Sequence, residues 1–243
     1  MRFEDKVVIV TGASSGIGEG VARKFLDEGA LVVGCGIEPE MHIESSRAIY
    51  VQANLTEFAQ AQHVVEEAVK AFGRVNKLVC CARVTFVGSL ETTDYDTFMR
   101  ELSINMGGVF NMCKAAISEL KKQEGSTIVN VGSDLGVRPI PERIGYCPSN
   151  GRGNHADQVH RPGVRAPHPR QRHSSGPGAH AHDRAALHRG RGPGGSGRIL
   201  RQLVPPAQDG QDRGHGQRHR LLSSDESGFI TGEIMQVCGG SLI

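Results

Sequence analysis

The sequence contains no uninterrupted apolar run of the roughly 18 residues that a transmembrane helix needs. Its first residues, Met1 to Lys6, include no apolar stretch of the kind found in a signal peptide. We therefore expect a cytoplasmic protein without a membrane partner. No two cysteines are spaced as Cys-X-X-Cys, and this predicts buried thiols rather than a disulfide framework or a metal site. The six cysteines are Cys35, Cys80, Cys81, Cys113, Cys147 and Cys238.

The segment from Asn150 to Arg220 contains no lysine, glutamate, phenylalanine, tyrosine or tryptophan. This segment holds 13 Arg against four Asp, a formal charge of +9, whereas the whole chain carries only +2 and the remainder is therefore at −7. It also holds nine of the 11 His and seven of the 11 Pro. A segment of this composition buries too little apolar surface to offset the entropy lost on ordering it.

The stretch from Val8 to Gly18, V-I-V-T-G-A-S-S-G-I-G, predicts an anion site. The apolar run that ends at Val10 is typical of a buried strand, and a helical pattern begins at Glu19. The glycines between them allow a sharp turn and a close approach of a ligand. Free N–H groups and the positive end of the helix dipole then point at the pyrophosphate of a dinucleotide.

The string T-G-A-S-S-G-I-G resembles the cofactor loop of the short-chain dehydrogenase/reductase family; the alternative is a structural loop of another α/β protein. The resemblance implies a doubly wound parallel sheet, Rossmann-like, in a single domain of residues 1–243 with a nicotinamide cofactor. It also implies a small alcohol or ketone substrate and a homodimer or homotetramer. The residues it assigns to the cofactor are Gly12, Ser14, Ser15, Gly16, Ile17, Gly18, Asn54, Leu55 and Ala82.

Hydrophobic periodicity places the elements that follow the loop. Strands are predicted at 30–35, 48–53, 77–81 and 127–131, and helices at 18–28, 57–72 and 95–116. The chain has 243 residues, enough for one α/β domain with a sizeable core. The resemblance ceases at Asn150 and resumes at Leu221, with a last strand expected at 233–237.

The choice between NAD and NADP depends on the end of the second strand. An acid there binds the adenosine ribose in NAD enzymes of the family, whereas a base there or in the loop favours NADP. Here Gly36 and Ile37 precede Glu38, and Ser15 occupies the loop position of the base. Glu38 without a neighbouring arginine favours NAD over NADP.

After the fourth strand the chain departs from the family. The family has Asn-Asn-Ala-Gly, and this chain has Cys80-Cys81-Ala82-Arg83, in which only Ala82 matches. Arg83 is expected to bring a large side chain to a place where close approach to the cofactor is usual.

Ser133 and Tyr146 are separated by 13 residues, the family's spacing for its substrate-binding serine and its acid/base tyrosine. A tyrosine with a pKa of about 10 is a poor base at neutral pH and needs a nearby cation. The family supplies a lysine four residues on, which also binds the nicotinamide ribose, but this chain has Asn150. Asn105, in S-I-N-M-G-G, resembles the asparagine that supports a water chain to that lysine; the alternative is a satisfied core amide.

Two hypotheses explain residues 150–220. One inserted nucleotide in codon 150 and one lost near codon 222 would make the segment a frame-shifted translation. The restored frame can begin Lys-Ala-Ala-Val-Ile, which returns the missing lysine at the position of Asn150. Alternatively the segment is real, and the protein is a catalytically impaired cofactor-binding remnant with a basic, polyanion-binding insert. Nucleic acid is not the expected partner, and the irregular spacing of the histidines does not predict a metal site.

Overall fold

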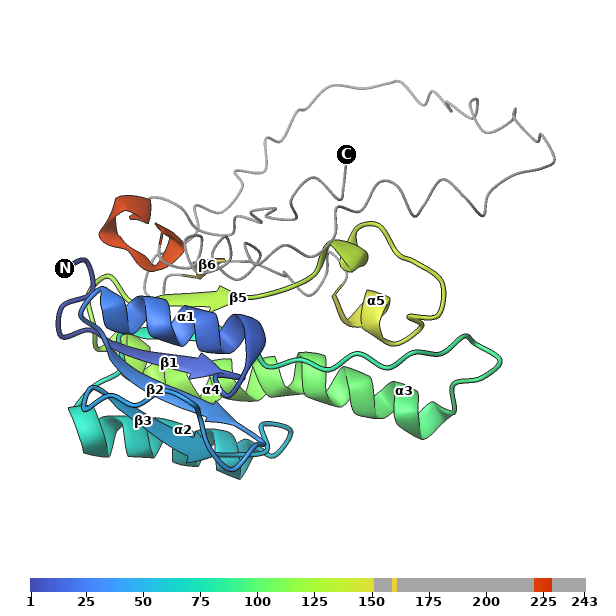
Figure 1. Cartoon of the computed structure of the whole chain (residues 1–243), viewed down its shortest axis with the longest axis horizontal. Helices are drawn as coiled ribbons and strands as arrows, with labels where there is room; N and C mark the ends of the chain where they lie inside the picture. The colour runs from blue at the N-terminus through green and yellow to red at the C-terminus, as the bar shows by residue number, and fades with distance from the viewer. Residues whose placement is uncertain (151–158, 161–220, 229–243) are drawn as a thin grey trace, which may run out of the picture. The chain divides into compact units, whose positions relative to one another are not determined.

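The computed structural model describes residues 1–150, 159–160 and 221–228, and all of these belong to one compact unit (Figure 1). Of the segment 150–220, which is expected to be anomalous, the structure describes only Asn150, Val159 and His160. The other residues of the segment lie outside the described part of the chain. So do Cys238 and the last strand expected at 233–237. The single-domain assignment of residues 1–243 and the frame-shift hypothesis therefore stay predictions.

Five parallel strands form the sheet, in the order β3-β2-β1-β4-β5. Parallel strands are covered by helices on both faces, so they are read in sequence as continuous apolar runs. Every residue of β1, β4 and β5 is buried accordingly, and the predicted strands are confirmed to within two residues. Their bounds are β1 Val7–Thr11, β2 Leu31–Gly36, β3 Ala48–Gln52, β4 Lys77–Cys80 and β5 Thr127–Asn130.

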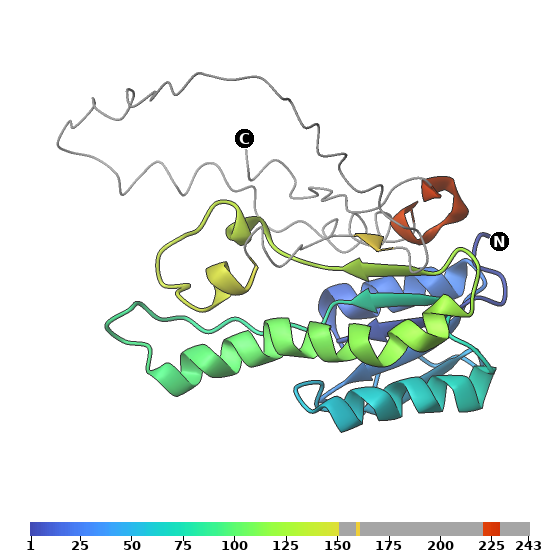
Figure 2. The ribbon, with the colours of Figure 1, turned by 180° about the vertical axis from the view of Figure 1, so that it is seen from behind.

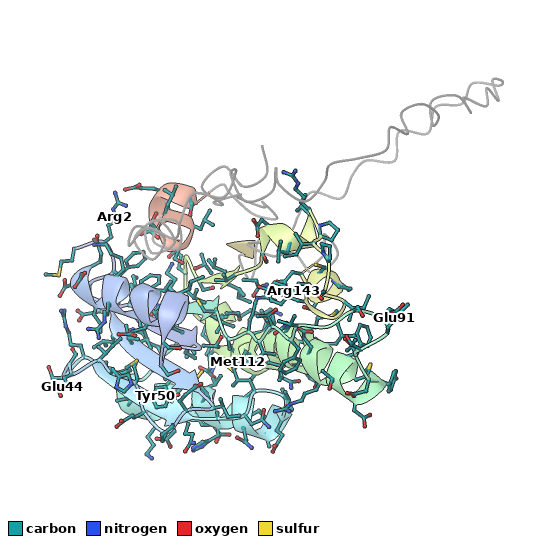
Figure 3. The ribbon with its side chains drawn as sticks, turned by 45° about the vertical axis from the view of Figure 1, so that its right-hand side comes forward. Arg2, Glu44, Tyr50, Glu91, Met112 and Arg143 are labelled. Atoms are coloured by element: carbon teal, nitrogen blue, oxygen red, sulfur yellow. The ribbon has the colours of Figure 1, made fainter. Side chains whose placement is uncertain are left out.

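Helices cover both faces of this sheet, which confirms the doubly wound fold (Figure 2). α1 (Gly16–Asp27) packs on one face through Val21, Ala22 and Phe25. α2 (Phe58–Phe72) and α4 (Gly108–Lys121) pack side by side on the other face. Met112 of α4, labelled in Figure 3, is fully buried in that second core.

The helix predicted over 95–116 is longer than expected and is not uniform. α3 (Tyr95–Leu102) continues into a π-helical turn, η1 (Ser103–Gly107), before α4 begins. Asp94 caps α3, because its carboxylate accepts the backbone N–H of Thr97 at 2.7 Å. π-helical turns widen the backbone and occur frequently at functional sites, and this one contains Asn105.

The sheet has a sixth, antiparallel strand that the sequence did not predict. β6 (Val159–His160) pairs with β5, within the segment whose composition predicts no regular structure. Farther along, Leu222 is fully buried in the core under α1, and the 3-10 turn η4 (Asp225–Ser227) follows. In the described part of the chain, no helix is both long enough and apolar enough to span a membrane.

Candidate active site

The glycine loop joins β1 to α1 with a backbone that only glycine adopts readily. Gly12 has φ +67° and Gly16 has φ +54°, both in the left-handed region. A Cβ on Gly12 would lie 2.9 Å from the Cα of Ala82, and one on Gly18 would overlap the carbonyl of Gly12. A Cβ on Gly16 would meet open space instead, so at this position the loop faces outward at the start of α1. Ser14, Ser15 and Ile17 fill the turn between these glycines.

Thr11 fastens the end of β4 to this loop. Its Oγ1 accepts the backbone N–H groups of Cys81 and Ala82, each at 3.0 Å. Thr11 is 2% exposed, so both bonds are shielded from water. Sequence reasoning chose Ala82 and missed Thr11, although a hydroxyl residue at the end of a buried strand was the available signal.

Glu38 lies against the same loop from the end of β2. Its carboxylate accepts the hydroxyl of Ser14 at 2.9 Å, and its backbone carbonyl accepts the hydroxyl of Tyr50 at 3.0 Å. Burial, and to a smaller extent the negative charge of Glu38, raises the pKa of Tyr50 to about 12. The Tyr50 hydroxyl therefore remains a hydrogen-bond donor at neutral pH. Tyr50 stands on the β3 side of the molecule in Figure 3. The acid is thus fixed beside the glycine loop, where an adenosine ribose would need an acceptor.

Asn54 and Leu55 follow β3 at the same edge of the sheet. The Oδ1 of Asn54 accepts from the backbone N–H and the hydroxyl of Thr56, at 3.2 and 2.8 Å, and its Nδ2 donates to Glu57. The carbonyl of Leu55 accepts from Asn111 of α4 at 3.0 Å. The second N–H of Nδ2 makes none of these bonds and could donate to adenine, whereas an additional bond to Oδ1 would compete with Thr56.

Asn105 has its side-chain hydrogen bonds satisfied. It is 1% exposed, and its amide exchanges two bonds of 2.9 Å with the backbone of Val84. Its Nδ2 also donates to Ser149 Oγ at 3.0 Å. Asn105 therefore ties the segment after β4 to α5 (Tyr146–Ser149). These contacts are those of a satisfied core amide. A satisfied amide can also orient a site, so the supporting role that the resemblance implies for Asn105 is compatible with them.

Ser133 and Tyr146 are brought to neighbouring elements. Ser133 caps the 3-10 turn η2 (Asp134–Gly136), accepting the backbone N–H of Leu135 at 3.2 Å, and η2 packs against α5. Tyr146 is the first residue of α5 and is partly exposed. The 13-residue spacing thus spans two elements that meet at the carboxyl end of β5.

Asn150, at the position of the family's lysine, is 2% exposed. Its Nδ2 donates to the carbonyl of Tyr146 at 2.9 Å and to Ser149 Oγ at 3.2 Å. Within residues 1–150, 159–160 and 221–228, its Oδ1 is buried without a hydrogen-bond partner. The described residues around Asn150 thus supply acceptors for its N–H groups and no donor for its oxygen.

Arg83 follows Ala82 at the end of β4, and its large side chain is held by two backbone carbonyls. Its Nε donates to the carbonyl of Val131 at 2.6 Å, and its Nη1 lies 3.5 Å from the carbonyl of Asn105. The side chain therefore runs from the end of β4 toward the end of β5 and the π-helical turn.

A pocket of about 480 Å³ opens against α5, where Cys147 and Pro148 line it. Two segments form it, one after β4 and one leading into α5, and they are joined by a parallel bridge between Gly88 and Arg143. Arg143, labelled in Figure 3, belongs to the second segment. The walls are mainly apolar side chains: Leu90, Pro139, Ile140, Pro141, Ile144 and Pro148.

Acid groups and thiols in the described residues offer no metal centre, since no group of three or more His, Cys, Asp or Glu converges there. No disulfide joins the cysteines of the described residues, which are Cys35, Cys80, Cys81, Cys113 and Cys147. The residues that could hold a group are instead those of the glycine loop, whose donors suit a dinucleotide pyrophosphate.

Comparison with known proteins agrees with this geometry. A family model described as short chain dehydrogenase matches residues 6–155. An uncharacterized oxidoreductase of Thermotoga maritima is 30% identical over 99% of both chains. Meso-2,3-butanediol dehydrogenase of Serratia marcescens is 32% identical over 62% of both chains, and NAD-dependent glycerol dehydrogenase of Listeria innocua is 29% identical over 61% of this chain and 60% of its own.

Among solved structures, aldohexose dehydrogenase of Thermoplasma acidophilum superposes with a TM-score of 0.57 at 28% identity. That match covers 60% of this chain and 56% of the other. Apart from the Thermotoga oxidoreductase, the chain thus matches about three fifths of the length of the relatives named here.

Proposed function

Because this chain belongs to the short-chain dehydrogenase family of oxidoreductases, we propose that it interconverts a secondary alcohol and a ketone with NAD as its cofactor. The observation that carries the proposal is the meeting of three features at one edge of the sheet. These are the glycine loop with Glu38 beside it, the η2–α5 pair that bears Ser133 and Tyr146, and the apolar pocket next to them.

The cofactor would lie over the loop of Gly12, Gly16 and Gly18, with its pyrophosphate at the start of α1. The Glu38 carboxylate would accept a hydroxyl of the adenosine ribose, exchanging its bond to Ser14. The same carboxylate would repel the extra phosphate of NADP, which is why NAD is preferred. When bound, the nicotinamide supplies or accepts the hydride.

The chain's own residues handle the substrate oxygen and its proton. Ser133 Oγ would hold the oxygen by a hydrogen bond, and the hydroxyl of Tyr146 would give the proton during ketone reduction or take it during alcohol oxidation. Asn150 holds the carbonyl of Tyr146 in place but contributes no charge to stabilise a phenolate. Oxidation at neutral pH is therefore expected to be slow.

The substrate body would occupy the pocket that Cys147 and Pro148 of α5 line, and its apolar walls favour a compact, largely uncharged molecule. The names of two relatives, a butanediol and a glycerol dehydrogenase, support a small alcohol. Like many oligomeric relatives of this kind, the protein would act as a homodimer or homotetramer, which sedimentation of the purified chain would test.

The test is a screen of the purified chain with NAD and NADP against small secondary alcohols and their ketones, followed at the absorbance of the reduced cofactor. NAD-dependent turnover that Tyr146→Phe abolishes would support the proposal. Turnover that survives Tyr146→Phe would contradict the role of Tyr146, and absence of dinucleotide binding would contradict the proposal as a whole.

A second candidate is favoured by the neutral side chain at position 150: a cofactor-binding protein with little turnover. It predicts NADH binding without measurable oxidation of any alcohol in the screen. If the basic segment from Asn150 to Arg220 is real, the same protein should also bind nucleic acid with an affinity that falls steeply with salt.

A further inference from the structure

Arg83 reaches from the cofactor loop to the segment that carries the candidate catalytic residues. The backbone of its neighbour Ala82 lies against Gly12 and is held there by Thr11. Its guanidinium ends between the carbonyl of Val131, two residues before Ser133, and the carbonyl of Asn105. Both acceptors are neutral backbone groups.

The same guanidinium joins the network around position 150. Asn105 donates to Ser149 Oγ at 3.0 Å, and Ser149 Oγ donates in turn to the carbonyl of Tyr146 at 2.8 Å. Asn150 donates to that carbonyl and to Ser149. Hydrogen bonds therefore connect Arg83, through Asn105 and Ser149, with the position from which the expected cation is missing.

Other charged groups also lie near these segments. Glu101 is 2% exposed, accepts the backbone N–H of Phe86 at 3.0 Å, and lies against Gly145, the residue before Tyr146. Arg143 lines the pocket, and Asp134 directly follows Ser133. The hydrogen bonds named above for the Asn105–Ser149 network involve none of these three groups.

We infer that Arg83 is a cofactor-binding cation at the nicotinamide end of the site, and that it supplies there the positive charge that Asn150 lacks. A guanidinium fork suits the oxygens of a ribose or a pyrophosphate, and its charge attracts the dianionic dinucleotide. The inference rests on the proposed NAD-binding function. It concerns affinity and placement of the cofactor, and it leaves the proton transfer to Tyr146.

The experiment measures NADH binding to the full chain by fluorescence titration at several salt concentrations. Arg83→Met, which keeps the stem and removes the charge, should weaken binding about tenfold, the value of one charge-assisted hydrogen bond. It should also flatten the salt dependence. Arg83→Lys should keep the salt dependence and recover part of the affinity, and it serves as the test variant if Arg83→Met does not fold.

The matched control is Arg74→Met. Arg74 also donates to a backbone carbonyl, that of Asp5 at 2.6 Å, but it lies outside the network, so NADH affinity should change by less than about twofold. Unfolding temperatures of all variants separate lost stability from lost affinity.

A double-mutant cycle with Asn150→Lys tests whether the two positions share one task. The lysine should tighten NADH binding about tenfold in the Arg83→Met background and hardly at all in the wild type, where two cations would compete for one place. Additive effects, or tighter binding by Arg83→Met alone, would overturn the inference while leaving the proposed function standing. Failure of the wild-type chain to bind any dinucleotide would overturn both.

Discussion

Asn150→Lys is the substitution that changes the chemistry of the site most directly. The buried Oδ1 of Asn150 lacks a partner among the described residues, at a cost of about 1–3 kcal/mol. A lysine removes that oxygen and, one helical turn after Tyr146, would bring an ammonium group beside the tyrosine side chain. Burial of the ammonium costs several kcal/mol in return, so we expect stability to change little or to fall modestly.

The effect on turnover follows from placing a positive charge beside Tyr146. An opposite charge within a few ångströms stabilises a phenolate and lowers its pKa by about 1–3 units. At a pH below that pKa, such a change raises the phenolate fraction by about 10- to 1000-fold. Alcohol oxidation uses that phenolate as its base, so kcat/KM for oxidation should rise by the same factor.

The assay is the pH dependence of kcat/KM for oxidation of the best alcohol from the screen. Asn150→Lys should shift the rising limb to lower pH, because the base ionises earlier. Asn150→Met has similar length and no charge, and it should leave the limb where the wild type has it. Equal rates and equal limbs for the lysine and methionine variants would refute the argument that the missing charge limits this site.

Four further outcomes follow from the contacts. Tyr146→Phe should abolish turnover and leave the dissociation constant of NADH unchanged, as fluorescence titration would show. Glu38→Gln should narrow the preference for NADH over NADPH by about tenfold in the same titration. Thr11→Val, which removes the shared acceptor of the Cys81 and Ala82 N–H groups, should lower the free energy of unfolding by about 1–3 kcal/mol in urea. Burial raises the pKa of Glu101, so the free energy of unfolding of the wild type falls as pH rises through that pKa. Glutamine does not titrate. The free energy of unfolding of Glu101→Gln should therefore exceed that of the wild type increasingly as pH rises, and no such gain is expected in acid.

The regular elements could be predicted because their signals are local. Runs such as Val7 to Val10 are buried on both faces of a parallel sheet, and the glycines of the loop are required by positive φ and close packing. The π-helical turn around Asn105 could not be predicted, because the long-range bonds to Val84 and Ser149 define its surroundings and periodicity does not encode them. The two-residue strand β6 could not be predicted either, because it is defined by its pairing with the distant strand β5.

Site residues divide in the same way. Ser133 and Tyr146 were found from their spacing, and the structure places them on adjoining elements. Thr11 was missed because its function is a pair of bonds to a strand 70 residues away. The large side chain of Arg83 was expected near the cofactor, but its direction toward the carbonyls of Val131 and Asn105 could not be predicted, since the sequence gives the size of a side chain and not its contacts.

Two of the departures from the family pattern, at positions 83 and 150, lie 67 residues apart and meet in one hydrogen-bond network. If both residues belong to the native protein, Arg83 supplies the positive charge in place of the family's lysine. Asn150→Lys in the wild type should then add little to cofactor affinity. If the frame-shift hypothesis is right, the native chain carries a lysine beside Arg83, and the site holds two cations near a dianionic ligand. Peptide mapping of the native protein across residues 147–224 decides between these cases. The double-mutant cycle of NADH binding then measures whether positions 83 and 150 are coupled. Coupling is expected if both cations contact the same phosphate or ribose of the cofactor.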